Sequence, residues 1–349
     1  MKRITTTIIS AAAAFLALAP VAGAHDFSKT LKDGNTLYFN IIDAESKTVE
    51  LTYEGKRFNK QNNHPKGEIV VSDFVTHEGV IYKVVAISDR AFYGADSLAK
   101  LTLPKNLVEI GDLAFAKCPL LTTVNFGSKQ IEFGDDVFYG TENIEEVTFE
   151  NGWTALDLNL FSQLLGVSEI NVPASVRKIT NLKTMGSLEA INVSEENTAF
   201  SSVDGLLYSK DKKTLYACPV SYKDSVYVAE GTENILTGAF RNCENVSLVS
   251  LPVSIRQFNL NEFENLPFLK SLIINSVIPP VTAIQDGEQK FALRLGKEAK
   301  VYVPDNALSV YHNVVVTKAG VYSYPGSTAE MEYEADGFVG KKGIKAIKK

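Results

Sequence analysis

The residues best suited to acid–base or metal chemistry are four histidines, His25, His64, His77 and His312. No two of them have the short spacing of zinc sites or zinc-dependent hydrolases. The chain also has no glycine-rich phosphate loop and no nucleophile elbow. We therefore expect no catalytic residue, no metal site and no cofactor, and we predict that the protein is not an enzyme.

Three cysteines, Cys118, Cys218 and Cys243, are the other reactive side chains. Their number is odd and their spacing is not paired, so we expect no disulfide framework. Cys118 and Cys243 each follow a recurring phenylalanine by three residues, which predicts small apolar residues inside a packed core. The sequence places no basic residue to lower the pKa of these thiols, so we expect no reactive cysteine.

Most of the chain follows a sequence repeat, and the four histidines lie outside its regular part. Phenylalanines recur at 23-residue intervals, and apolar residues follow six, nine and eleven positions later, as Leu98, Leu101 and Leu103 follow Phe92. This is the L-x-x-L-x-L pattern of leucine-rich repeats. One repeat is too small to bury its own apolar face, so neighbouring repeats must stack. The phenylalanines that we expect to form a buried ladder are Phe92, Phe115, Phe138, Phe161, Phe240 and Phe263.

The plus-nine position of each repeat predicts the centre of an inner strand. Most of these centres are 23 residues apart, but Ile170 and Ile191 are separated by 21 residues and Ile191 and Val226 by 35. With similar sequences at 69–71 and 301–303, we expect about ten strands and a sheet roughly 45 Å long. The predicted centres are Leu101, Val124, Val147, Ile170, Ile191, Val226, Val249 and Leu272.

The 35-residue interval contains a predicted insertion. In residues 205–216, two short apolar runs flank a charged turn around Asp211, which indicates a β-hairpin. Phe240 then resumes the repeat spacing. We therefore expect the hairpin to be an addition to one repeat and the solenoid to fold without it.

Four segments make up the predicted organisation. Residues 1–24 combine a basic start, an apolar stretch and a final Ala-Gly-Ala, which is typical of a cleaved signal peptide. Residues 25–66 contain two alternating stretches, which predict a small N-terminal β cap. Residues 67–305 form the predicted solenoid. Residues 306–349 form a predicted C-terminal cap and a basic tail.

The predicted mature chain is mildly acidic. Removal of Lys2 and Arg3 with the signal peptide changes the formal charge from −6 to −8, which disfavours nucleic acid and anionic membranes as partners. No later run has the roughly 20 apolar residues of a transmembrane helix. We expect an exported protein that is secreted, periplasmic or surface-associated. Cleavage would make His25 the amino terminus, where we expect an ordinary exposed end rather than a copper chelate.

The repeat unit at 108–124 resembles the BspA-like leucine-rich repeat family of exported bacterial proteins. The resemblance covers roughly residues 67 to 311. It implies a leucine-rich repeat solenoid, mainly β with irregular turns, in a secreted or surface-associated protein that adheres to host or bacterial macromolecules. The segments that support it are 85–94, 108–124, 204–208, 278–280 and 301–304, followed by Tyr311.

Outward-pointing strand residues are the candidate interaction surface. The plus-ten positions form a row of threonine, asparagine and serine, which either bind a ligand by hydrogen bonds or are simply solvated. Glu146 and Glu169 are at plus-eight positions in consecutive repeats, one strand apart, where carboxylates repel each other. Either solvent screens them or they attract a cation or a basic partner. The candidate residues are Thr102, Asn125, Glu146, Thr148, Glu169, Asn171, Asn192 and Ser250.

An extended repeat surface without a catalytic constellation predicts a binding module. We expect a monomer that acts in protein interaction or adhesion, with a protein or glycan of a host or bacterial surface as ligand. The alternatives are a structural scaffold of the cell envelope or matrix and, from another class, a secreted hydrolase.

Overall fold

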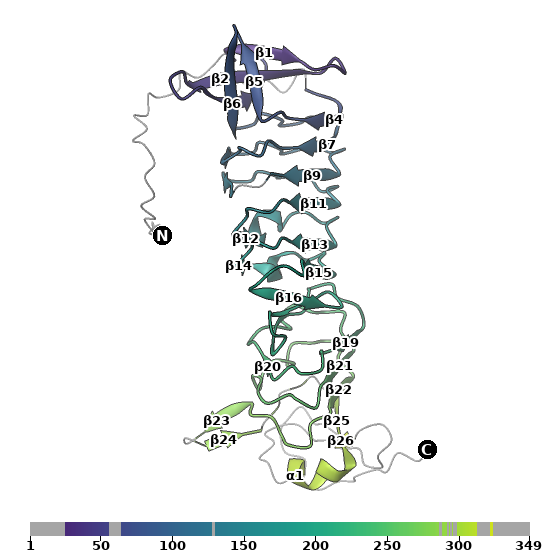
Figure 1. Ribbon diagram of the computed structural model, residues 1–349. Coiled ribbons are helices and arrows are strands. Elements are labelled where there is room, and N and C mark those ends of the chain that lie inside the picture. The colour runs from purple at the N-terminus through teal and green to yellow at the C-terminus, as the bar shows by residue number, and fades with distance from the viewer. Residues whose placement is uncertain are drawn as a thin grey trace.

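The computed structural model describes residues 25–55, 64–127, 130–285, 288–291, 293, 295, 299–312 and 322–323. The predicted signal peptide and the predicted basic tail after residue 323 lie outside these ranges. The described chain winds into an elongated β-solenoid with a small N-terminal β cap at one end (Figure 1). The predicted fold class is therefore confirmed. No described helix is long and apolar enough to cross a membrane.

One stack of parallel strands runs along the solenoid (Figure 1). The predicted plus-nine residues all lie in strands of this stack, and every one of them is buried. The strands are β4 (Gly67–Val70), β7 (Leu98–Thr102), β9 (Thr123–Phe126), β11 (Glu146–Phe149), β13 (Glu169–Val172), β15 (Ala190–Val193), β19 (Ser225–Tyr227), β21 (Leu248–Leu251), β22 (Ser271–Ile274), β25 (Lys300–Val303) and β26 (Tyr322–Ser323).

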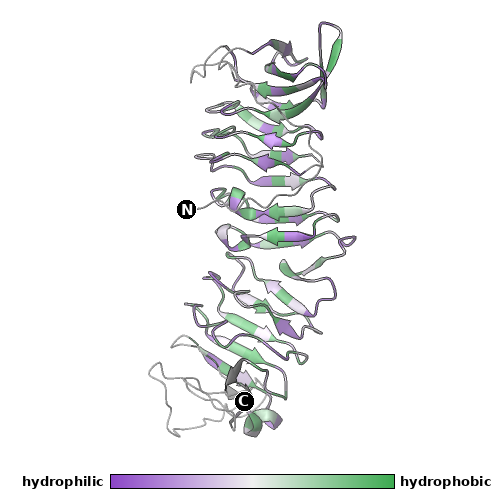
Figure 2. Ribbon diagram, turned by 90° about the vertical axis from the view of Figure 1, so that its left-hand side faces the viewer, coloured by the Kyte–Doolittle hydropathy of each residue, from purple (hydrophilic) through white to green (hydrophobic). Residues whose placement is uncertain are grey.

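The hydrogen-bonded pairing within this first stack is divided into three sheets, β4-β7-β9-β11, β13-β15 and β19-β21-β22-β25-β26. Within each sheet the register matches the repeat, as Val124 pairs with Leu101 and with Val147. Hydrophilic and hydrophobic residues alternate along the stacked strands (Figure 2). This alternation follows from the two-residue period of a strand, which turns the leucine positions inward and their neighbours outward.

A second stack of short strands closes the other side of each turn. Its strands form three separate parallel pairs. They are β8 (Glu109–Ile110), β10 (Glu132–Phe133), β12 (Ala155–Asp157), β14 (Lys178–Thr180), β18 (Thr214–Ala217) and β20 (Asn234–Ile235). The 3-10 helices η1 (Leu158–Phe161) and η2 (Leu182–Thr184) follow β12 and β14.

The N-terminal cap covers the first turn. Its strands pair antiparallel, except that β3 and β6 run parallel and β6 joins the cap to the second stack through β8. Buried apolar side chains such as Phe39, Val49 and Leu51 extend the solenoid core into the cap. The cap strands are β1 (Phe27–Thr30), β2 (Thr36–Asp43), β3 (Thr48–Thr52), β5 (Phe74–His77) and β6 (Val80–Ile87).

The recurring phenylalanines lie inside the solenoid. Phe115 stacks between Phe92 and Phe138, with ring centroids 5.4 and 5.6 Å apart. The ring of Phe161 is tilted by 39° from that of Phe138 and lies 6.1 Å away. Phe240 and Phe263 form a separate pair at 5.1 Å. Since the backbone repeats at the strand spacing of about 4.8 Å, a residue at a fixed position in each turn meets its own equivalent.

In two repeats, the turn before the ladder phenylalanine requires a glycine. Asp112 donates its backbone N–H to the Asp89 carboxylate at 2.8 Å, and Asp135 does the same to Asp112. A Cβ at Gly111 would clash with the Asp89 carboxylate, and one at Gly134 with the Asp112 carboxylate. The carboxylates of Asp89 and Asp112 can therefore link successive turns only because Gly111 and Gly134, which precede the donating N–H groups, have no side chain.

The predicted hairpin segment is part of the core. It forms a meander of β16 (Phe200–Val203), β17 (Leu206–Ser209) and β18, and β18 pairs in parallel with β20 of the next turn. Leu207 packs in an N-terminal hydrophobic cluster, whereas Leu206 and Tyr208 pack in a C-terminal one. β17 therefore separates two cores. The expectation that the solenoid folds without this segment is at odds with this burial.

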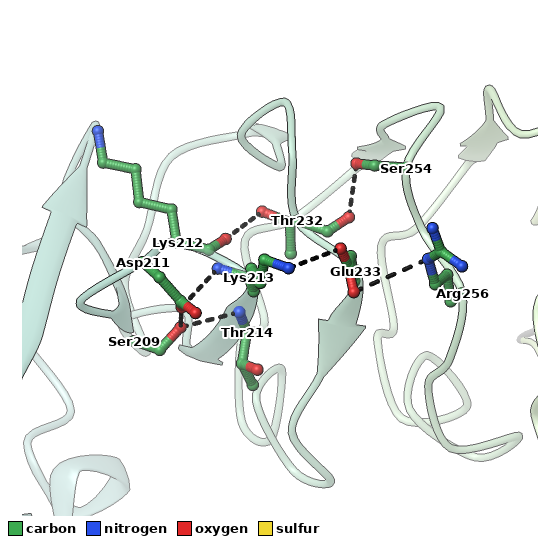
Figure 3. A network of polar contacts seen from close by, with 9 residues as sticks. All are labelled: Ser209, Asp211, Lys212, Lys213, Thr214, Thr232, Glu233, Ser254 and Arg256. Carbon is green, nitrogen blue, oxygen red and sulfur yellow. Dashed lines mark hydrogen bonds and ion pairs between the residues drawn. The ribbon is translucent and has the colours of Figure 1, made fainter.

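The turn of the hairpin is tied to the next two turns by polar contacts (Figure 3). The Asp211 carboxylate accepts hydrogen bonds from the Ser209 hydroxyl and the Lys213 backbone N–H, at 2.7 and 3.1 Å. The Lys213 ammonium lies 3.2 Å from the Glu233 carboxylate, which also faces Arg256 at 3.8 Å. Lys213 and Arg256 are exposed and Glu233 is half-buried, so both ion pairs are partly solvated and each adds at most about 1 kcal/mol.

The C-terminal end of the described solenoid is closed by short elements and a buried tyrosine. The Tyr311 hydroxyl donates to the Ser276 carbonyl at 2.9 Å, and the Tyr311 ring meets Phe291 edge to face. The elements here are β23 (Ala283–Gln285), β24 (Glu288–Lys290), the 3-10 helix η3 (Asp305–Ala307) and α1 (Leu308–His312), which is the α-helix of the described residues.

Candidate functional site

The predicted polar row lies on the outward side of the first stack. Its members alternate with buried residues such as Val124 and Ile170. The row is not uniform in exposure, because the packing of neighbouring strands differs along the solenoid. Its half-buried members are Thr102, Asn125, Thr148 and Ser250, and its exposed members are Asn171 and Asn192.

In the N-terminal turns the polar row bonds to itself. The Asn125 side-chain amide donates to the Thr102 hydroxyl at 3.3 Å and accepts from the Thr148 hydroxyl at 2.6 Å. The Asn275 amide similarly donates to the Ser250 hydroxyl at 3.3 Å. Hydrogen-bonding groups that already bond to each other offer little net gain to a ligand. These hydrogen bonds stabilise the strand face.

Asn171 and Asn192 lie side by side at the edge of a hollow. They are register partners on β13 and β15, and both line a shallow depression of about 390 Å³ that also includes Asn151 and Pro173. The hollow lies where the first stack changes from the sheet of β11 to that of β13. The Asn192 amide donates to the Glu169 carboxylate at 3.0 Å, which orients it beside Asn171.

The two acidic candidates are exposed, but they belong to different sheets. Glu146 is on β11 and Glu169 is on β13, and the pairing described for the first stack separates these strands. The nearby Glu150 forms an exposed ion pair with Lys105 at 3.3 Å. Repulsion along this acidic surface is therefore weakened by solvent and by a cation of the chain itself.

A cluster of a half-buried lysine and two buried thiols was not predicted from the sequence. The Lys183 ammonium, on η2, donates to the carbonyls of Cys218 and Ala239, the latter at 2.7 Å, and to Cys243 Sγ at 3.6 Å. The Ala239 contact joins residues that are 56 positions apart in sequence. Lys183 thereby adds a donor to backbone oxygens of two later turns, and the Ala239 oxygen also accepts the Cys218 backbone N–H at 2.9 Å.

The expectation that no basic residue perturbs a cysteine is wrong for Cys243. A hydrogen bond from Cys218 and the adjacent Lys183 charge lower the pKa of the Cys243 thiol. Burial, together with Cys243 as neighbour, raises the pKa of Cys218. For Cys118 the expectation is correct, since burial raises its pKa to about 12 and its Sγ lies 3.1 Å from the Phe92 carbonyl oxygen. The Lys183 contact could not be predicted from local residue spacing because the partners are far apart in sequence.

Glu262 completes the polar interior of the C-terminal turns. Its carboxylate accepts hydrogen bonds from the backbone N–H groups of Gly238 and Phe240, at 2.8 and 2.9 Å. Burial raises the pKa of Glu262, while these hydrogen bonds and the Lys183 charge oppose the shift. Glu262 also lines a hollow of about 810 Å³, whose other residues include Arg241 and are mostly polar.

The histidines take structural positions where they are described. The His77 ring stacks on Phe27 at 4.2 Å, and His25 Nδ1 accepts a hydrogen bond from the Gly55 N–H at 3.0 Å. Burial lowers the pKa of His64. The side chain of His312 lies outside the described residues. Within the described ranges, no group of three His, Cys, Asp or Glu side chains could hold a metal ion.

Similar solved structures are bacterial leucine-rich repeat proteins. The pneumococcal vaccine antigen PcpA is 18% identical, with 82% of this chain and 96% of that chain covered and a TM-score of 0.43. A leucine rich cell surface protein from Faecalibacterium prausnitzii A2-165 is 20% identical, with coverages of 80% and 85% and a TM-score of 0.37. A leucine-rich repeat protein from Bacteroides ovatus ATCC 8483 is 17% identical, with coverages of 78% and 79% and a TM-score of 0.36.

A search of curated proteins gives no match. The family described as the BspA type leucine rich repeat region matches residues 80–202 and 212–287, in six copies. The match covers more than half of the chain, and its gap at 203–211 falls in the β17 meander. The chain therefore belongs to the BspA-type leucine-rich repeat family.

Proposed function

We propose that this protein is an exported binding module that acts in adhesion or protein interaction through the outward face of its solenoid. The observation that carries the proposal is the pair of exposed amides, Asn171 and Asn192, at equivalent positions of adjacent strands beside a hollow. The signal-peptide pattern of residues 1–24 supports export.

The chemistry of this face suits a chain-like ligand. Side-chain amides both donate and accept hydrogen bonds, and adjacent strands present them about 4.8 Å apart. Such a row complements an extended polymer that carries polar groups at regular intervals. A glycan and a peptide strand are both polymers of this kind. Asn171 and Asn192 are the exposed members of the row, so a ligand reaches them without breaking the Thr102 to Thr148 hydrogen bonds.

A binding experiment with defined probes tests the proposal. Arrays of purified extracellular matrix proteins and of defined oligosaccharides would be probed with the parent and with an Asn171→Ala, Asn192→Ala double variant. We expect saturable binding by the parent and at least a tenfold loss in the double variant, about 1.4 kcal/mol. The matched control is Thr102→Ala with Ser250→Ala, on the same row but outside the hollow, which should retain binding.

Three outcomes would contradict this assignment. Self-association without any saturable foreign ligand would favour a scaffold of the envelope or matrix. Loss of binding in an Asn261→Ala, Asn265→Ala variant, with retention in the Asn171 and Asn192 variant, would move the site to the larger hollow, which those two residues line. Turnover of an oligosaccharide or peptide probe would instead favour a hydrolase.

A further inference from the structure

We propose that Cys218 and Cys243 are a redox-active pair that closes to an intramolecular disulfide bond on reaction with a disulfide oxidant, with Lys183 selecting Cys243 as the attacking thiolate. The assignment is independent of the ligand-binding role proposed above. It rests on the placement of the two thiols and of the ammonium beside them.

The two thiols lie against the same short stretch of backbone. Cys243 Sγ is 3.5 Å from the Cys218 carbonyl oxygen and 3.4 Å from the Pro219 carbonyl oxygen. Cys218 Sγ is 3.5 Å from the same Pro219 oxygen. Each thiol also shifts the pKa of the other. Consecutive turns therefore bring together two sulfurs that are 25 residues apart in sequence.

The charges around the pair make the two sulfurs unequal. The Cys218 side chain and the Lys183 ammonium, which donates to Cys243 Sγ at 3.6 Å, lower the pKa of Cys243. Burial and the Glu262 charge oppose this shift of the pKa. Burial keeps Cys218 protonated, because its pKa is raised. A thiolate beside a protonated thiol is the arrangement of an attacking and a resolving cysteine.

The reaction balances with a low-molecular-weight disulfide as oxidant. The Cys243 thiolate attacks one sulfur of that disulfide and expels a thiolate, which leaves a mixed disulfide on Cys243. Cys218 then loses its proton and attacks Cys243 Sγ, and the second thiolate leaves. The protein loses two protons and two electrons, and the oxidant becomes two thiols. Both cysteines are fully buried, so the oxidant gains access by local opening of these turns.

The third cysteine provides a control within the same chain. Cys118 is equally buried, but the group around its sulfur is the Phe92 carbonyl, and its pKa is raised to about 12. It follows a ladder phenylalanine by three residues, as Cys243 does. The two cysteines therefore occupy the same position in the repeat, and they differ because Lys183 and Cys218 lie beside Cys243.

Thiol counting after oxidation tests the pair. The reduced protein would be incubated with oxidised glutathione, quenched with acid, denatured and alkylated. We expect all three cysteines to be alkylated before oxidation and Cys118 alone afterwards, with a peptide that links Cys218 to Cys243 in a non-reducing digest. Cys118→Ser should still form the link. Cys218→Ser should instead accumulate glutathione on Cys243.

The role of Lys183 is tested by rate and pH. In the parent, Cys243 should react with a pH midpoint below the ordinary thiol value of about 8.5 and more than about tenfold faster than Cys118. Lys183→Gln should raise the midpoint and slow the reaction, and Lys183→Arg should restore it. The proposal would be overturned if all three cysteines could still be alkylated after glutathione treatment, both in the native protein and in protein refolded in the same buffer. A link that involves Cys118 would overturn it as well.

Discussion

The turns from Phe92 to Phe161 and the turns from Lys183 to Phe263 use the same repeat but are held together differently. The first set is filled by stacked phenylalanine rings and uncharged side chains. The second set contains Lys183 and Glu262, which bond to backbone groups of neighbouring turns. The ring ladder is interrupted between Phe161 and Phe240, where Leu182 occupies the buried position.

The two regions also differ in repeat length. In the first region the strand centres are 23 residues apart and the interior is filled by apolar side chains. The interval changes to 21 and then to 35 residues before the second region, where the Lys183 ammonium donates to the carbonyls of Cys218 and Ala239, and the Ala239 carbonyl also accepts the Cys218 backbone N–H at 2.9 Å. A buried polar group of this kind is stabilising only while all its partners remain in place. The second region should therefore be the more sensitive to change.

Deletion of residues 205–216 should have the largest effect. It removes β17, whose side chains pack in both hydrophobic clusters, and part of β18, which pairs with β20. We expect the C-terminal cluster to lose cooperative unfolding while the N-terminal one remains folded, because solenoid turns are stabilised by their neighbours. Urea denaturation with amide hydrogen exchange would measure both. A single transition with the parent's denaturant dependence would show that the segment is a dispensable insertion. Asp211→Asn is the control and should keep the parent's transition.

Phe115→Ala should cost roughly 3 to 5 kcal/mol of unfolding free energy, as expected for a large-to-small change in a core. Its ring is fully buried between two others, so the cavity cannot be filled by solvent or by collapse of one neighbour. Thr102→Ala, on the outward row of the adjacent strand, should change stability by about 0.5 kcal/mol or less. If the two substitutions changed the unfolding free energy equally in urea denaturation, the predicted difference between the buried phenylalanine ladder and the outward polar row would be wrong.

The fold could be predicted because the spacing of the repeat indicates which residues pair between neighbouring strands. A Leu, Ile or Val at the ninth position of a 23-residue unit has only one place in a stack, and every such residue is buried in the structure. The contact of Lys183 with Cys243 could not be found in the same way. It joins residues 60 positions apart across the two irregular intervals, so no equivalent pair elsewhere in the chain indicates it. The interruption of strand pairing between β11 and β13, which carry Glu146 and Glu169, was missed for a related reason, because regular spacing does not reveal where strand pairing stops.

Glu262→Gln should lower the unfolding free energy by about 1 to 3 kcal/mol, the usual cost of an unsatisfied buried group. The carboxylate accepts from two backbone N–H groups with its two oxygens, whereas an amide presents a donor to one of them. The pKa of Glu262 is raised in the folded state. Its contribution to stability is therefore full below its ordinary value of 4.5 and declines as pH rises through the folded pKa. This decline should be absent in the variant when urea denaturation is repeated across that range.

Neutralising the acidic pair should have the smallest effect on stability. Glu146 and Glu169 are exposed and lie on separate sheets, so their mutual repulsion is screened, and Glu146→Gln with Glu169→Gln should change the unfolding free energy by about 0.5 kcal/mol or less. The substitution at Glu169 leaves a side-chain carbonyl oxygen in place, which would still accept the hydrogen bond that Asn192 donates in the parent.

The same double variant distinguishes a charged binding surface from a solvated one. If a basic protein binds this face, the variant should associate more slowly and with a weaker dependence on salt, because charge acts mainly on the encounter rate. If the face binds calcium, millimolar calcium should raise the melting temperature of the parent and leave that of the variant unchanged, because the ion binds the native state. No difference in either measurement would assign both carboxylates to the solvated surface and leave recognition to the uncharged amides beside the hollow, where Asn171→Ala with Asn192→Ala tests it directly.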